Sequence, residues 1–314
     1  FLLFNQVIML KRVFQEPPVL FGEDFSPSLE SILDSVRISL PVWCNLKCIY
    51  CCTGAEGKAE GLEFGKFLNI VEDTKKLGAK TIKIVGHGEP LLYPKLFELL
   101  DFIQKKQMKT VLFTNNTCIT KGIARKLFGY ELSVVAKLNS FDEKTQNLLC
   151  GCSAFNDICF GLNNLLEAGF NKTKPSRLGI DSVICRQNFE EVPKLFRFCR
   201  ENNIVPKLEV LTIKGRAKKN YSPAKIQLRK LVLGLLEIDR KCFGFSWDPG
   251  AKHIAEKPSG LSKSCFIDEN GFVYPTTASE NSAGNILQKL LKEILVSKAF
   301  ENAKKSDVHF KKMI

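Results

Sequence analysis

Short β-branched segments alternate with amphipathic helical patterns along most of this chain. Strands are predicted at Val36–Leu40, Thr81–Val85, Thr110–Thr114, Leu132–Leu138, Leu178–Ile184 and Leu208–Ile213. Helices are predicted between them at Glu63–Leu77, Lys95–Lys106, Lys121–Phe128, Asn156–Ala168, Phe189–Asn202 and Ser222–Ile238. Regular β–α alternation implies parallel strands joined by right-handed crossovers. The predicted fold class is therefore α/β, a partial (β/α)6 TIM-like barrel with its chemistry at the carboxyl ends of the strands.

The pattern changes after about residue 240. A loop rich in proline and glycine leads to CFIDENGFVYP, which predicts a β-hairpin with its turn at Glu269-Asn270-Gly271. The next segment, GNILQKLLKEILVSKAF, predicts one amphipathic helix. We expect an N-terminal segment (1–35), a barrel (36–240) and a small hairpin-plus-helix extension (241–314). The apolar opening FLLFNQVIMLKRVF predicts a first strand or docking helix, with membrane contact as the alternative.

The chain is basic and rich in cysteine, and neither property by itself identifies a partner. There are 46 basic and 33 acidic residues, a net charge of +13, mostly lysine that solvates helix faces. The lysine-rich tail lacks interleaved aromatic residues, so nucleic acid binding is not expected. No apolar run reaches the length of about 18 residues that a membrane span needs. Twelve cysteines in a long chain do not indicate a secreted disulfide scaffold, and a cytoplasmic location is predicted.

Three cysteines are spaced as a metal-binding motif directly after the first predicted strand. In RISLPVWCNLKCIYCCTG, Cys44, Cys48 and Cys51 form Cys-x3-Cys-x2-Cys. Three thiolates can bind three irons of a cubane and leave the fourth iron open, whereas ferredoxin-type clusters use four cysteines. Zinc is the competing interpretation, but a structural zinc site needs four ligands. Cys52 adjoins Cys51 and is a poor partner on the same ion, so it is predicted to pack or point away.

A second motif, Gly86-His87-Gly88-Glu89-Pro90, lies at the end of the second predicted strand. Its glycines permit close approach of another backbone. The motif alone would indicate little more than a turn. Together with the cysteines, it places a carboxylate at the same edge of the sheet as the metal-binding loop.

The two motifs together resemble those of the radical SAM superfamily. The resemblance implies a 4Fe–4S cluster whose open iron is chelated by S-adenosylmethionine (SAM), and reductive cleavage of SAM to a 5′-deoxyadenosyl radical. It implies that Tyr50 lies by the adenine and that Gly86, His87, Gly88 and Glu89 bind the methionine part, with Glu89 on the ammonium. His87 stands where the family usually has a second glycine.

Further strand-end residues match softer positions of the family. FTNNT follows the third strand, where the family often has Thr-Asn-Gly. The resemblance implies that Ser140, together with Asn139 beside it, meets the ribose or carboxylate of SAM. It implies a charge-assisted bond from Arg186 to the methionine carboxylate. Lys137 is expected to face the cavity near the substrate.

The C-terminal extension resembles the family's auxiliary-cluster module without one of its ligands. Cys265, the hairpin, Tyr274-Pro275 and Gly284-Asn285-Ile286 follow the module's pattern, but Thr276 stands where it has cysteine. A second cluster is therefore not expected. Cys242 and Cys265 are either buried apolar residues or candidate catalytic hydrogen-atom donors.

The predicted function is a radical SAM enzyme that abstracts hydrogen from a small polar substrate. A loose likeness to carbohydrate and aminoglycoside epimerases suggests epimerisation, with Glu209 on a cationic amino sugar. The alternatives are a peptide- or cofactor-maturing radical SAM enzyme and, from another class, a non-catalytic metal-binding interaction protein. The expected partners are a small-molecule substrate and an external electron donor of flavodoxin or ferredoxin type.

Overall fold

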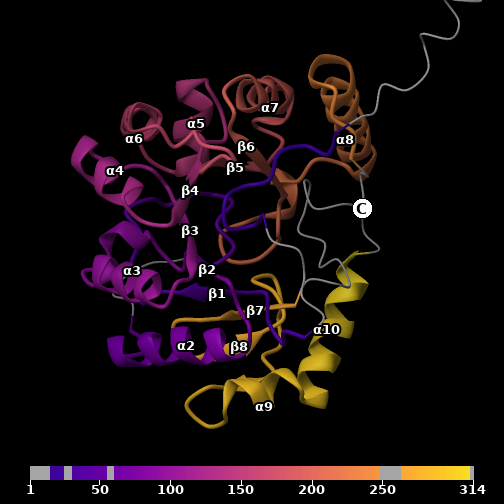
Figure 1. Cartoon of the computed structure of the whole chain (residues 1–314). Helices are drawn as coiled ribbons and strands as arrows, with labels where there is room; N and C mark the ends of the chain where they lie inside the picture. Colours follow the sequence, from indigo (N-terminus) through magenta and orange to yellow (C-terminus); the bar gives the residue numbers. More distant parts are fainter. Residues whose placement is uncertain (1–14, 25–29, 55–59, 248–262, 312–314) are drawn as a thin grey trace, which may run out of the picture.

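The computed structural model describes residues 15–24, 30–54, 60–247 and 263–311. The opening segment 1–14, for which a strand or docking helix was predicted, lies outside these residues. Parallel strands run in chain order as β1 (Ser35–Ser39), β2 (Thr81–Val85), β3 (Lys109–Thr114), β4 (Leu132–Lys137), β5 (Leu178–Ile184) and β6 (Val205–Val210). This confirms the α/β prediction, and the unclosed sheet is the predicted partial barrel (Figure 1).

The C-terminal hairpin is built onto the same sheet. Its first strand, β7 (Ser264–Ile267), pairs with β1 in parallel, and the antiparallel strands β8 (Phe272–Tyr274) and β9 (Gly284–Asn285) follow. The full order is β6-β5-β4-β3-β2-β1-β7-β8-β9. The predicted hairpin is therefore present, and it lengthens the barrel sheet beside the strand that precedes the cysteines. The division into three domains stays a prediction.

Helices cover the outer face of the curved sheet (Figure 1). They are α2 (Phe64–Lys76), α3 (Leu96–Lys105), α4 (Lys121–Phe128), α5 (Glu143–Cys150), α6 (Phe155–Ala168), α7 (Val192–Glu201) and α8 (Lys225–Ile238). In α3 the buried residues Leu96, Leu99, Leu100 and Ile103 recur at helical spacing, which explains why the apolar pattern found it. Among the described residues, no helix is long and apolar enough to cross a membrane.

Three elements differ from the predictions. Helix α5 was missed because only one end of it is apolar and buried, and Leu148 is largely exposed. Strand β6 begins at Val205, earlier than predicted, and contains Pro206. As the edge strand of the sheet, β6 does not need the N–H that proline lacks. The single helix predicted over 284–300 is instead β9, α9 (Leu291–Leu295) and the start of α10 (Lys298–Lys311).

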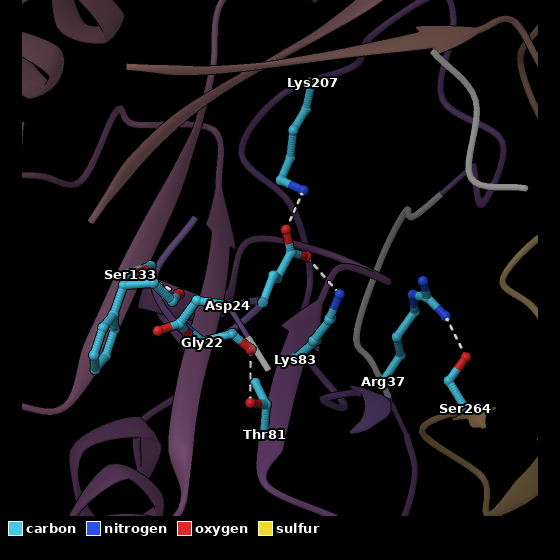
Figure 2. Close-up of polar contacts among 10 residues, drawn as sticks. Gly22, Asp24, Arg37, Thr81, Lys83, Ser133, Lys207 and Ser264 are labelled. Carbon is cyan, nitrogen blue, oxygen red and sulfur yellow. Dashed lines mark hydrogen bonds and ion pairs between the residues drawn. The ribbon is translucent and has the colours of Figure 1, made fainter. Parts of the chain in front are cut away.

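A segment preceding β1 fastens the amino-terminal end of the barrel from inside. The Phe21 and Gly22 carbonyls accept hydrogen bonds from the Ser133 and Thr81 hydroxyls, at 2.7 Å each. The Glu23 carboxylate lies between Lys83 of β2 and Lys207 of β6, with 2.7 Å from its Oε2 to the Lys207 Nζ. Figure 2 shows both lysines directed toward this carboxylate, and Arg37 directed toward Ser264 of β7. The lumen is thus partly charged.

Glu23 is expected to contribute strongly to stability. Burial alone would raise its pKa, but Lys207 and Lys83 outweigh burial and hold the pKa well below its usual value of 4.5. A depressed folded-state pKa stabilises the fold above the unfolded-state pKa, and this contribution is lost as pH falls. We expect Glu23→Gln to lower the free energy of unfolding by about 3 kcal/mol at pH 7, because two lysines lose their counter-ion. Below about pH 4.5 the difference from wild type should shrink.

Urea unfolding at several pH values measures this effect. Asp24→Asn is the matched control, because Asp24 pairs with Lys109 at a more exposed position. Exposed pairs contribute at most about 1 kcal/mol. Equal destabilisation by both substitutions would show that the Glu23 contacts have no special role in the fold.

Candidate functional site

The cysteine loop follows β1 without regular secondary structure and is held on three sides. One support is the end of α5. The Cys150 carbonyl accepts a hydrogen bond from the Lys47 N–H at 3.1 Å, and the Leu149 carbonyl accepts one from the Ile49 N–H at 3.0 Å. Gly151 adopts the left-handed conformation (φ 69°), and a Cβ there would lie 2.3 Å from the Lys47 carbonyl oxygen. The turn that ends α5 must therefore be glycine to pack against this loop.

The second support is the Gly86–Glu89 turn after β2. The Glu89 N–H donates to the Trp43 carbonyl at 3.0 Å, one residue before Cys44. A Cβ on Gly88 would lie 2.0 Å from the Val42 carbonyl oxygen, so this close crossing needs glycine. At Gly86 a Cβ would meet the Gly88 carbonyl oxygen at 2.5 Å. The two sequence motifs are thus locked together by backbone contacts.

The third support comes from the loop after β6. The Arg216 N–H donates to the Cys51 carbonyl at 2.9 Å, and its Nε donates to the Cys48 carbonyl at 3.0 Å. A Cβ on Gly215 would lie 2.6 Å from the Cys51 carbonyl oxygen and 2.7 Å from that of Cys52. Sequence reasoning missed Arg216 as part of the site.

The three predicted ligands share the loop but have different surroundings. Burial raises the pKa of the Cys44 thiol to about 11. The pKa of Cys48 is lowered to about 7, first by a hydrogen bond with the Cys150 thiol and further by the charges of Lys137 and Arg216, against burial. Cys51 Sγ lies 3.2 Å from the Thr53 hydroxyl. Cys52 has its pKa raised to about 11 by burial.

This donor set fits a cubane cluster. Each of the three cysteines would bind a different iron, so the thiols need not converge on one point. A single zinc ion needs four convergent ligands. Among the described residues, no group of three or more His, Cys, Asp or Glu side chains is arranged to hold one metal ion.

Glu89 is buried, and donors at the end of β3 and from nearby Leu91 hold its carboxylate. Its Oε1 accepts from the Thr114 hydroxyl at 2.7 Å and from the Leu91 N–H at 3.1 Å, and its Oε2 accepts from the Asn115 N–H at 2.6 Å. Burial raises the pKa of Glu89 to about 7, while these donors act in the opposite direction. A buried carboxylate beside the cysteine loop is suited to binding a cationic group.

Tyr50 is buried beside the last cysteine of the motif. Its hydroxyl accepts a hydrogen bond from Asn139 Nδ2 at 2.8 Å, and Asn139 Oδ1 accepts from the Val183 N–H at 2.9 Å. The Lys137 ammonium lies 5.2 Å from the centre of the Tyr50 ring. The residue at the end of β4 that meets the cysteine loop is therefore Asn139.

Ser140 and Arg186, for which the resemblance implies contacts with SAM, both make hydrogen bonds within the protein. The Ser140 hydroxyl donates to Glu191 Oε1 at 2.7 Å, on the side of α7, so it is committed to a structural contact. Arg186 is exposed, and its Nε donates to the Ser222 carbonyl at 2.7 Å. The contacts of both side chains with SAM stay predictions. His87 lies in the glycine turn, with its Nδ1 3.1 Å from Glu269 Oε1 in the C-terminal hairpin.

The two candidate hydrogen-atom donors also lie away from the cysteine loop. Cys265 is fully buried in the main core, and its register with Val36 places it on the helix-facing side of the sheet. Cys242 is exposed after α8, and its Sγ accepts from Arg197 Nη1 of α7 at 3.2 Å. Cys265 is therefore buried as one of the two predicted alternatives has it, Cys242 is not, and the donor role of either thiol stays a prediction. Thr276, which stands where the auxiliary-cluster module has a cysteine, is hydrogen-bonded to Ser279.

An ion pair lies inside the barrel below the cysteine loop. Lys137 ends β4 and pairs in register with Asp181 of β5, and 2.5 Å separates its Nζ from Asp181 Oδ2. Burial would lower the pKa of Lys137, but Asp181 and then Glu209 outweigh burial and raise it. Asp181 Oδ1 is buried without a hydrogen-bond partner among the described residues. The place of Lys137 near a substrate stays a prediction, and its pairing with Asp181 was not anticipated.

Comparison with known proteins identifies the family. The profile of the Radical SAM superfamily matches residues 38–199, which is more than half of the chain. The chain therefore belongs to the radical SAM superfamily, whose members use a 4Fe–4S cluster and SAM.

Relatives and solved structures agree with this assignment. The chain is 29% identical over 174 residues to a "Probable GTP 3′,8-cyclase" of Methanococcus maripaludis, covering 53% of this chain and 55% of the relative. It is 30% identical over 168 residues to "Fe-coproporphyrin III synthase" of Methanosarcina barkeri, covering 51% and 39%. The crystal structure of Streptococcus suis SuiB bound to S-adenosylmethionine has the same fold, with a TM-score of 0.65 at 19% identity over 88% of this chain and 68% of that one. The chain thus matches about half the length of the cyclase.

Proposed function

We propose that this chain holds its cluster at Cys44, Cys48 and Cys51 and binds SAM beside it through Glu89. The observation that carries the proposal is the junction of the two motifs. The Glu89 N–H donates to the Trp43 carbonyl, and Gly88 leaves no room for a side chain against Val42. These contacts hold three thiols and a buried carboxylate at one edge of the sheet. A non-catalytic metal scaffold has no need for such a carboxylate.

The protein's own groups then have distinct tasks. Cluster and SAM, when bound, supply reductive cleavage of the sulfonium C–S bond to a 5′-deoxyadenosyl radical. Glu89, oriented by Thr114 and Asn115, would accept hydrogen bonds from the methionine amino group. Tyr50, oriented by Asn139, forms a wall for the adenine. The electron comes from an external donor of flavodoxin or ferredoxin type.

The substrate is proposed to be a small polar molecule bound in the barrel lumen. Lys137 and Asp181 lie there, and Oδ1 of Asp181, which has no partner among the described residues, can accept a hydrogen bond from a substrate. A buried acceptor without a partner is costly, so a substrate donor at this atom would be favoured. Carbohydrate epimerisation is not retained, because the reported relatives are named as a cyclase and a synthase and the predicted thiol donors lie elsewhere. Cofactor maturation is the second candidate, supported by those names.

The direct test is SAM cleavage. Enzyme reconstituted anaerobically with iron and sulfide, then reduced with dithionite, should release 5′-deoxyadenosine and methionine from SAM, measured by liquid chromatography and mass spectrometry. An enzyme with a full cluster but no 5′-deoxyadenosine would contradict the proposal. GTP is the first substrate probe. GTP consumption with faster 5′-deoxyadenosine release would support cofactor maturation, and unchanged GTP would argue against this nucleotide.

Asp181→Asn separates the substrate pocket from the SAM site. We expect its SAM affinity, and its 5′-deoxyadenosine release without substrate, to change far less than those of Glu89→Gln, because Asp181 does not touch the Glu89 network and reaches Tyr50 only through Lys137. Equilibrium dialysis with labelled SAM measures the affinity. A large loss of SAM binding would assign Asp181 to the cofactor site instead of the substrate pocket.

A further inference from the structure

Asn115 is the one described residue with hydrogen bonds both to the proposed SAM ligand and to a proposed cluster ligand. It follows Thr114, the last residue of β3. Its backbone N–H donates to Glu89 Oε2 at 2.6 Å. Its side-chain Nδ2 lies 3.7 Å from Cys44 Sγ, within the range of a hydrogen bond to sulfur, and 2.8 Å from Asn45 Oδ1.

The orientation of the Asn115 amide is fixed by its oxygen. Asn115 Oδ1 accepts from the Thr117 N–H at 3.0 Å and from the Thr117 hydroxyl at 2.7 Å. A flipped amide would place its NH2 group against these two donors. In the observed orientation, the two N–H bonds of the Asn115 side chain are therefore directed toward Cys44 and Asn45. Asn45 is held in turn, since its Nδ2 donates to the Thr117 hydroxyl at 2.8 Å.

A donor aimed at a cluster-binding sulfur has a known physical effect. Reduction adds one negative charge to the cluster, and hydrogen bonds to its sulfurs stabilise that charge and raise the reduction potential. Cys44 is half-buried, and the Glu89 carboxylate nearby repels added negative charge. The Asn115 amide is placed to offset this repulsion, because the same residue contacts the Glu89 carboxylate through its backbone and the Cys44 sulfur through its side chain.

We propose that Asn115 is a positioning residue that raises the reduction potential of the cluster through its N–H bond to Cys44, while its backbone orients Glu89. The inference rests on the proposed cluster site. It assigns two roles to the end of β3. One is to make the cluster easier to reduce, and the other is to hold Glu89, the proposed ligand of SAM.

The experiment is a redox titration of the reconstituted enzyme without SAM, followed by the EPR signal of the reduced cluster. Asn115→Leu keeps similar volume but has no donor. We expect its oxidised-to-reduced ratio at a fixed potential to rise about tenfold, equivalent to a midpoint about 59 mV more negative. Asn115→Ser, which is too short to reach Cys44, should shift in the same direction. Asn45→Ala removes the other amide contact, keeps the one to Cys44, and should match wild type.

The outcomes are distinct. Wild-type midpoints in both Asn115 variants, with full iron and sulfide content, would overturn the role of Asn115 and leave the proposed function standing. An equal shift in Asn45→Ala would also overturn it, because the effect would then come from loop disturbance. A wild-type chain that takes up no cluster would contradict the proposed function itself.

Discussion

Cys51→Ala is expected to abolish cluster assembly and 5′-deoxyadenosine formation, whereas Cys52→Ala is expected to preserve both. Loss of a residue that hydrogen-bonds to a metal ligand typically lowers metal affinity or activity about 10- to 100-fold, so loss of a ligand itself should lower them more. The two neighbours are a matched pair. Gly215 packs against both of their carbonyls, and Arg216 bonds the Cys51 carbonyl, all through backbone that alanine retains. Any difference between the variants therefore reports on the thiols.

Iron and sulfide content and the visible absorbance after anaerobic reconstitution measure this prediction, with SAM cleavage assayed in parallel. Equal circular dichroism spectra of the two apo variants would show that both are folded. A Cys51→Ala enzyme with a full cluster and wild-type cleavage would refute the assigned ligand set. Loss of the cluster in Cys52→Ala but not in Cys51→Ala would show that Cys52 is the third ligand in place of Cys51.

Glu89→Gln is expected to weaken SAM binding by about 100-fold, near 2.7 kcal/mol, because truncating one partner of a buried charged hydrogen bond costs 2–5 kcal/mol. Glutamine keeps the size of the side chain and removes the negative charge that accepts the N–H bonds of the methionine amino group. It also turns an NH2 group toward either the Asn115 N–H or the Leu91 N–H, so some stability should be lost.

Equilibrium dialysis of labelled SAM against the reconstituted enzyme measures the affinity. Glu191→Gln is the control for the structural part of the effect. Glu191 likewise accepts hydrogen bonds from a hydroxyl and a backbone N–H, those of Ser140 and Phe141, but outside the Glu89 network. We expect it to lose stability and keep SAM affinity. Unchanged SAM binding in Glu89→Gln would remove Glu89 from the site.

The sequence was most informative where function depends on local spacing. Cys44, Cys48 and Cys51 lie within one loop, and Gly88 and Glu89 lie within one turn, so their relation is visible in the chain itself. Strand periodicity then placed both motifs at the same edge of the sheet. The parallel order of β1 and β2 confirms that part of the prediction.

Residues that act through tertiary contacts were harder to identify. Arg216 reaches the cysteine loop from far along the chain, and Asp181 meets Lys137 only through strand register. Ser140 and Asn139 are adjacent in the sequence, but neighbouring residues at a strand end point in different directions, so only the structure shows that Asn139 contacts Tyr50 and Ser140 contacts Glu191. Arg186 and Cys265 were selected for the chemistry of their side chains. The direction in which each side chain points depends on tertiary packing, which the sequence does not display.

The most direct measurement of the central claim is electron–nuclear double resonance on the reduced, reconstituted enzyme with SAM whose methionine amino nitrogen is isotopically labelled. The claim is that Cys44, Cys48 and Cys51 leave one iron open and that SAM binds at this iron. A hyperfine coupling from the labelled nitrogen to the cluster is predicted in wild type and in Cys52→Ala. A reduced, fully assembled cluster that shows no coupling to SAM at saturating concentration would contradict the claim.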